Sequence, residues 1–189
     1  MKPVPAGGSV AALTVALAAG LVEKAARLST DHWIGAANVG KRAAVLRKVA
    51  TVLVDADAAA FTDYMKALRK ARGLRTVQRE AIIAPARERI VEVPLSIVRS
   101  AAEVAGLAAE MAEHGNPTLR SDAYAALQLA ATAAHTASVT ISDNVRSTKD
   151  PRLLEARRLA SGLARRRASR RPAGARGRGP ARSAGSGRR

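Results

Sequence analysis

The stretch PVPAGGSVAAL, residues 3–13, places two prolines and two adjacent glycines directly before a long apolar run. Proline holds the chain extended, whereas glycine lets the backbone turn tightly or approach another group closely. Ser9 is a favourable helix N-cap, and the alanine-rich sequence that follows it favours helix. The stretch therefore predicts a turn that leads into a capped helix. The turn is either purely structural or a site whose free N–H groups hold an anion.

Composition extends this helical prediction to the whole chain. The 189 residues are only 2% aromatic, alanine dominates the apolar residues, and cysteine is absent. Alanine has the highest helix propensity and lets helices approach closely, and runs of alternating β-branched residues are not evident. We therefore expect an all-α protein, a multihelical bundle with long antiparallel helices. The lack of cysteine excludes disulfides and thiolate zinc sites, and it fits a reducing, cytoplasmic compartment.

Prolines and glycines divide the chain into predicted helices. No proline or glycine lies in residues 41–70, which predicts one long helix after a loop at residues 29–40. Pro85 and Pro94 are expected to stop or interrupt the helices that reach them, and Gly115 is a typical C-terminal stop. Ser121 is the predicted N-cap of the helix that follows. The expected helices span residues 10–28, 41–70, 76–84, a piece up to 93, 95–113, 121–145 and 151–163.

The net charge of +17 is concentrated at the C-terminal end, because residues 165–189 hold ten arginines and no acid. Arginine mixed with glycine, serine and proline cannot bury apolar surface, so we expect a disordered tail there. The predicted organisation is a helical domain at residues 1–164 and a tail at residues 165–189. The tail could bind polyanions, including nucleic acid, without sequence specificity, or it could have no binding function.

The apolar run at residues 10–22 raises the question of a membrane segment or a signal peptide. It is shorter than the roughly 20 residues that span a bilayer, so no membrane partner is expected. A signal peptide would place Lys2 before the apolar run and a cleavage site near Ala18. The helical pattern continues without a break through residues 23–27, which favours a core helix over secretion.

Two acidic residues are candidates for chemistry. Asp57 follows Leu53 by one turn and precedes Phe61 by one turn, on the apolar face predicted for that helix. A carboxylate there is either paired with a lysine or arginine, or it is a functional acid or an anchor for an amidine-like ligand. Asp122 follows Ser121, where an acid complements the helix dipole. The three histidines lack metal-site spacing, so no metal is expected.

Four segments together resemble the cyclodeaminase/cyclohydrolase family, the folate-acting domain of formiminotransferase-cyclodeaminase. They occur in the family's order and cover roughly residues 3–155. Each motif is weak alone, whereas the ordered set is fairly specific. The segments are PVPAGGSVAAL at residues 3–13, DADAAAFTDYMKALR at 55–69, VPLSI at 93–97 and GNPTLRSDAYAA at 115–126.

The resemblance implies a helical, intertwined homodimer with the glycine-rich turn at the substrate site. It implies closure of 5-formiminotetrahydrofolate to 5,10-methenyltetrahydrofolate with release of ammonia. Hydrolysis of the methenyl form is the nearest alternative, and a non-catalytic interaction protein of the same fold is the second. The folate is then the substrate, with no tightly bound cofactor. The implied catalytic residues are Asp57 and Asp122, and the implied substrate-binding residues are Gly7, Gly8, Ser9, Asn116 and Ser121.

The chain also departs from the family pattern. Ala6 stands where the family has the first glycine of a triple, and Ser138 and Ser142 stand at two asparagine positions. The helix that precedes the turn in family members has no counterpart in this sequence. Serine is shorter than asparagine and has no amide, so these changes motivate the non-catalytic alternative.

Overall fold

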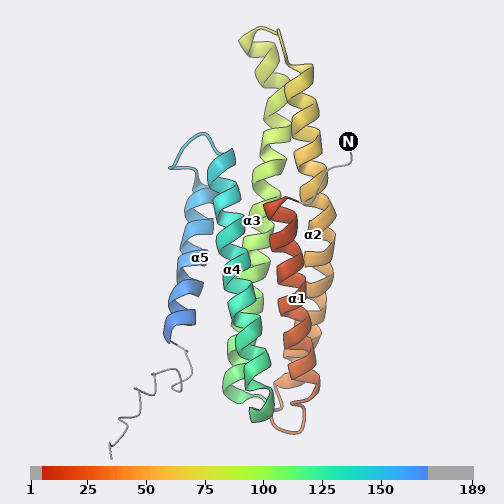
Figure 1. Ribbon diagram of the computed structural model, residues 1–189, viewed down its shortest axis with the longest axis vertical. Coiled ribbons are helices and arrows are strands. Elements are labelled where there is room, and N and C mark those ends of the chain that lie inside the picture. Colours follow the sequence, from red (N-terminus) through yellow and green to blue (C-terminus); the bar gives the residue numbers. More distant parts are fainter. Residues whose placement is uncertain (1–5, 170–189) are drawn as a thin grey trace, which may run out of the picture.

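The computed structural model describes residues 6–169, with side chains described up to residue 165 (Figure 1). Five α-helices and one short 3₁₀ helix make up this part of the chain, and it contains no strand, so the predicted all-α class is confirmed. The helices are α1 (Gly7–Arg27), α2 (Ala36–Lys70), α3 (Thr76–His114), η1 (Pro117–Leu119), α4 (Arg120–Asn144) and α5 (Pro151–Ser169).

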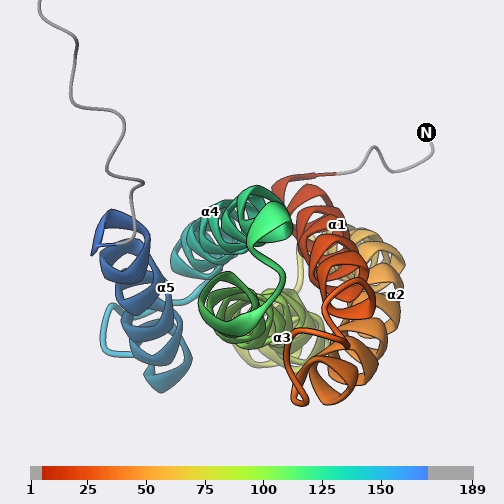
Figure 2. The ribbon, with the colours of Figure 1, turned by 90° about the horizontal axis from the view of Figure 1, so that it is seen from below.

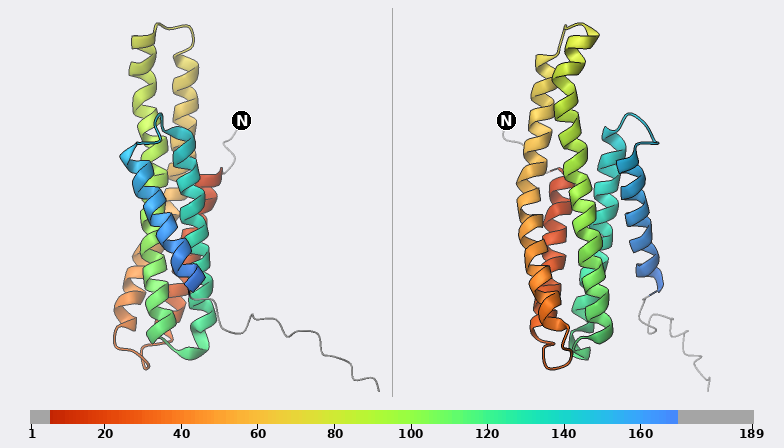
Figure 3. Two further views of the ribbon diagram at one scale, coloured as in Figure 1. Left: turned by 90° about the vertical axis from the view of Figure 1, so that its left-hand side faces the viewer. Right: turned by 180° about the vertical axis from the view of Figure 1, so that it is seen from behind.

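Successive helices run antiparallel. Seen along the bundle, α1, α2, α3 and α4 surround a common core, and α5 lies against the outside of α4 and also touches α3 (Figure 2). The joined ends of α2 and α3 project beyond α1 and α4 (Figure 3). Phe61, one turn past Asp57 on α2, and Val77, in the first turn of α3, are 50% and 83% exposed.

The largest difference from the predicted elements is α3, which runs unbroken from Thr76 to His114 through Pro85 and Pro94. Each proline removes a backbone donor and crowds the preceding turn, which costs about 3 kcal/mol in an isolated helix. Pro94 is fully buried among apolar neighbours, and packing of α3 against α2, α4 and α5 offsets that cost. The stops predicted at these two prolines were therefore wrong.

α2 also begins earlier than predicted, at Ala36 rather than residue 41. Gly40 lies inside the helix, where a Cβ would stand 3.2 Å from the Cβ of Ala26 on α1. The glycine thus permits close approach of α1 and α2 instead of ending a loop.

Small side chains dominate the core. The buried residues of α1 are mostly alanines, because small side chains let the helix axes approach each other. The larger residues Val10, Leu13 and Leu17 are 50–59% exposed, so the first half of this helix is not buried on all sides. By length and composition α1 could cross a membrane, with a mean hydropathy of 1.5 over an 18-residue window that is 56% buried. Its contacts with α2, α3 and α4 make it a core helix of the bundle.

The buried face of α2 is only partly the predicted one. Ala43, Leu46 and Ala50 face the core, whereas Phe61 is exposed. Asp57 is 8% exposed, so its predicted position on a buried face is confirmed.

Arginine–carboxylate pairs hold α5 in place. Arg152 bonds Asp150 and Glu88, and Arg99 on α3 donates two hydrogen bonds of 2.8 Å to Glu155. Hydrogen bonds from Arg152 hold the pKa of Asp150 below its usual value. α5 continues to Ser169, into the segment predicted as a tail, and residues 170–189 lie outside the described part of the chain.

Candidate functional site

Asp57 on α2 lies against the first turn of α1. The Ser9 hydroxyl donates a 2.8 Å hydrogen bond to Asp57 Oδ2, and both residues are buried. Ser9 is therefore not the N-cap that the sequence predicted, because α1 starts at Gly7 and its N-cap is Ala6. The serine lies in the first turn of α1, and its side chain donates to a carboxylate on a neighbouring helix.

Gly8 explains why the opening stretch needs a glycine. A Cβ at this position would stand 2.2 Å from Asp57 Oδ1 and 2.6 Å from its Cγ. No side chain fits there, so the carboxylate packs directly on the bare backbone of α1. A Cβ at Gly7 would instead meet only Thr136 on α4, at 3.9 Å. Gly8 is thus the glycine whose missing side chain makes room for the acid.

The charge of Asp57 has no cationic partner among the described residues. The sequence left open whether Asp57 is paired with a lysine or arginine or is a functional acid. Within residues 6–165 it has no such partner, so the first explanation fails there. The first-turn N–H groups of α1 carry the positive end of the helix dipole, which favours a carboxylate beside them. Asp57 Oδ1 has no hydrogen-bond partner in the described part of the chain, yet it is not fully buried, so it is free to meet a ligand.

Asp122 lies at the opposite end of α1. It stands in the first turn of α4, as predicted, and its carboxylate pairs with Lys24 Nζ at 2.8 Å. Gly8 and Lys24 are 16 positions apart on one helix, which corresponds to about 24 Å along its axis at 1.5 Å per residue. One chain therefore does not bring Asp57 and Asp122 to the same site.

The other predicted binding residues divide between these two ends. Asn116 links the segment after α3 to the segment after α1, because its backbone N–H donates to the buried Ser29 hydroxyl at 2.9 Å. Its side chain accepts a hydrogen bond from Thr118 N at 3.0 Å. Ser121 is exposed and is not the predicted N-cap, because α4 begins at Arg120 after Leu119. Asn116, Ser121 and Asp122 thus precede or begin α4, far along the bundle from Gly7, Gly8 and Ser9.

A basic cavity beside Asp122 was missed by the sequence reasoning. It has a volume of about 230 Å³ and is lined by Gly20, Glu23, Lys24, Arg27 and Arg47. Arg47 pairs with Glu23 at 2.8 Å, and Lys24 pairs with Asp122. The spacing of Gly20, Lys24 and Arg27 on one face of a helix was the only signal in the sequence for this cavity. Arg47 joins them only because α2 packs on α1.

A comparison with known protein families finds a match over residues 1–160 to the family described as formiminotransferase-cyclodeaminase. The chain belongs to this family. Members of the formiminotransferase-cyclodeaminase family are enzymes that act on folate derivatives, which confirms the resemblance carried by the four segments. No match was found among curated proteins.

A solved structure shares the fold. The crystal structure of a formiminotetrahydrofolate cyclodeaminase from Thermotoga maritima superposes with a TM-score of 0.75 at 23% sequence identity. The match covers 89% of this chain and 88% of that one. Ser138 and Ser142, at the family's asparagine positions, line a second cavity between α4 and α5. Thr136, by contrast, is the α4 residue nearest to Gly7.

Proposed function

We propose that the protein is a formiminotetrahydrofolate cyclodeaminase, which closes 5-formiminotetrahydrofolate to 5,10-methenyltetrahydrofolate and releases ammonia. The observation that carries the proposal is the buried, cation-free carboxylate of Asp57, packed on Gly8 and held by Ser9. The family match supports folate chemistry, and hydrolysis of the methenyl form is the alternative reaction. The substrate is a tetrahydrofolate derivative, with no tightly bound cofactor, and the expected location is the cytoplasm.

Ring closure requires one proton to move between nitrogens. N10 of the folate attacks the carbon of the protonated formimino group and loses its proton. That proton must reach the formimino nitrogen before this nitrogen leaves as ammonia, and the positive charge stays on the methenyl product. A carboxylate that accepts the first proton and returns it to the leaving nitrogen performs both steps. In our proposal Asp57 Oδ1 moves this proton, while the Ser9 hydrogen bond to Oδ2 fixes the orientation of the carboxylate.

The direct test is to incubate purified protein with 5-formiminotetrahydrofolate and follow ammonia release together with methenyl absorbance. We expect both to rise at the same rate. Hydrolysis of methenyltetrahydrofolate above the buffer rate without ammonia release would assign the alternative reaction. Folate binding without turnover of either compound would instead support the non-catalytic alternative, which the serines at positions 138 and 142 motivate.

We further propose a homodimer in which α1 lies in the interface. Val10, Leu13 and Leu17 form an exposed apolar stripe on one face of α1, and Lys24 continues the same face. A two-fold axis perpendicular to α1 near residue 16 would set two copies of the helix antiparallel. Gly8 of one subunit would then lie level with Lys24 of the other. Asp57 of one subunit and Asp122 of the other would thereby contribute to one composite site.

A mixing experiment tests the composite site. Asp57→Asn and Asp122→Asn proteins are each expected to be nearly inactive, and an equal mixture should regain about a quarter of wild-type activity after subunit exchange. This value follows because half of the dimers are mixed and one of their two sites is intact. Light scattering should give twice the 19.7 kDa chain mass at micromolar concentration. A single-chain mass, or no recovery on mixing, would contradict the proposal.

The arginine-rich C-terminal segment is expected to bind polyanions independently of the reaction. Residues 170–189 hold seven arginines and no acid and follow the end of α5. Deleting them should leave the turnover number and the thermal midpoint nearly unchanged, and it should lower the salt concentration that elutes the protein from heparin, because fewer counterions are released. Loss of activity at physiological salt would mean that the segment belongs to the site.

A further inference from the structure

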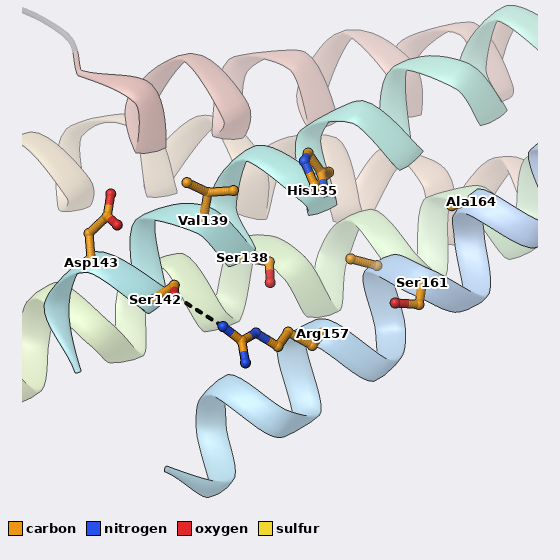
Figure 4. Close-up of a pocket in the computed structure, with 9 residues that line it drawn as sticks. His135, Ser138, Val139, Ser142, Asp143, Arg157, Ser161 and Ala164 are labelled. Atoms are coloured by element: carbon orange, nitrogen blue, oxygen red, sulfur yellow. Dashed lines mark hydrogen bonds between the residues drawn. The ribbon is translucent and has the colours of Figure 1, made fainter. Parts of the chain in front are cut away.

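A cavity lies between α4 and α5, away from the Asp57 site (Figure 4). It has a volume of about 310 Å³. Its lining is polar for a helix–helix contact, with three serine hydroxyls, one histidine ring, one guanidinium and one carboxylate. The lining residues are His135, Ser138, Val139, Ser142, Asp143, Arg157, Ala160, Ser161 and Ala164.

Ser138 is the first sign that this cavity receives a ligand. The residue is 6% exposed, and its hydroxyl makes no hydrogen bond within the described part of the chain, so the hydroxyl oxygen is not fully enclosed. Polar groups in protein interiors are paired either with protein atoms or with water, so this hydroxyl keeps its pairing capacity for whatever enters the cavity. Figure 4 shows the Ser138 oxygen directed into the cavity, on the side that faces α5. A ligand in the cavity would supply the missing partner.

Arg157 is the second sign. Its Nη2 donates a 3.2 Å hydrogen bond to the Ser142 hydroxyl, and within residues 6–165 it makes no ion pair. Arg152, one turn and a half earlier on α5, is by contrast paired with Glu88 and Asp150. The planar guanidinium of Arg157 therefore keeps donors for a ligand, and its fork matches the two oxygens of a carboxylate.

The remaining charged group of the lining limits the charge of that ligand. Asp143 is exposed, and Figure 4 shows its carboxylate pointing away from Arg157. Its negative charge disfavours two charges gathered on one group, as in phosphate, more than it disfavours a single carboxylate group. His135 lies on the same helix two turns earlier and faces the cavity from the opposite end.

We propose that the cavity between α4 and α5 binds the carboxylate group of a small organic acid. Arg157 holds the two carboxylate oxygens, and the Ser138 hydroxyl donates to one of them. This site is separate from the folate chemistry proposed for Asp57, because Ser138 and Arg157 lie on the α5 side of α4 while Gly7 meets α4 at Thr136. The ligand is either a free carboxylic acid or a larger molecule that carries one.

Histidine signals in the nuclear magnetic resonance spectrum give a direct readout. The chain has three histidines, and only His135 lines the cavity, whereas His32 and His114 lie at the end of the bundle where α1 leads into α2 and α3 into η1. Titrating the full-length protein with succinate at fixed pH and 0.15 M salt should shift the His135 ring signals saturably. The His32 and His114 signals should not move. Phosphate should bind more weakly than succinate.

Variants decide whether the cavity is responsible. Arg157→Gln and Ser138→Ala should each weaken succinate binding about tenfold or more. Arg158→Gln is the matched control, because it removes the same charge from the next, exposed position of α5 and does not line the cavity. Equal weakening by Arg157→Gln and Arg158→Gln, or no saturable shift of His135 with wild type, would overturn the proposal. Asp57→Asn should leave succinate binding intact. Loss of succinate binding in this variant would overturn the separation of the two sites.

Larger carboxylates distinguish the source of the ligand. Succinate should compete with any other carboxylate at this site. If the natural ligand is a free acid, succinate should displace it and leave folate turnover unchanged. If a reduced folate shifts the His135 signals and succinate inhibits turnover competitively, the carboxylate belongs to the folate itself. Both results leave the carboxylate site in place, and they remain interpretable if the proposed cyclodeaminase activity is absent.

Discussion

Replacing Asp57 with asparagine is expected to lower the turnover number by about 10²–10⁴-fold, the range that positioned acid–base groups contribute. Asparagine has nearly the same size, and its carbonyl oxygen can still accept the hydrogen bond from Ser9. The thermal midpoint should therefore stay the same or rise, because a buried charge without a cationic partner has been removed. The measurement is steady-state ammonia release together with a thermal melt.

Asp55→Asn is the matched control for this variant. Asp55 is exposed on α2 two positions before Asp57, so its replacement changes the net charge equally without touching the buried site. Its turnover should equal that of wild type. Full activity of Asp57→Asn would contradict the proposed role of this carboxylate.

The kinetic pattern separates the two roles that a carboxylate could have at this site. If Asp57 moves a proton, kcat falls while KM changes little, since the lost interaction acts in the transition state. If Asp57 instead holds the amidine-like edge of the pterin by a paired, charge-assisted contact, KM rises and kcat is less affected. We expect the first pattern.

Replacing Gly8 with alanine is expected to have the second large effect, on stability as well as on activity. The added Cβ would stand 2.2 Å from Asp57 Oδ1, 2.6 Å from Cγ and 2.8 Å from Oδ2. Either the carboxylate or the first turn of α1 must move, and overpacking of this kind costs about 1–3 kcal/mol. Chemical denaturation should show this loss, and ammonia release should fall because Asp57 is displaced.

Gly7→Ala is the control, since its Cβ would be 3.9 Å from the nearest atom, on Thr136. Alanine at an unstrained helical position usually stabilises a protein by about 0.4–1 kcal/mol, so this variant should be at least as stable as wild type. Adding Asp57→Ala to Gly8→Ala should restore stability by removing the clash, without restoring activity. Equal stability and activity of Gly8→Ala and wild type would mean that the carboxylate does not depend on the bare backbone.

The family match over residues 1–160 and the position of Asp57 on a buried face were both open to prediction from the sequence. Leu53 and Phe61 flank Asp57 at single-turn spacing, and this periodic pattern needs no knowledge of the rest of the fold. The pattern nevertheless placed Phe61 in the core, whereas it is half exposed, because α1 begins at Gly7, beside Asp57, and Phe61 lies a turn further along α2. A periodic pattern identifies a face of a helix but not where its neighbours end.

The sequence by itself determined the helical class, since alanine richness and the absence of alternating β-branched runs act through local propensity. Tertiary structure alone decided that α3 continues through Pro85 and Pro94, because the packing of buried α3 residues such as Ile83, Ile90 and Pro94 itself outweighs the local penalty. It also decided the role of Ser9, which favours a cap locally but bonds Asp57, 48 positions away. The distance between Asp57 and Asp122 likewise depends on which turns of the helices pack together. Local sequence cannot determine that register, because it arises from contacts between segments far apart in the chain.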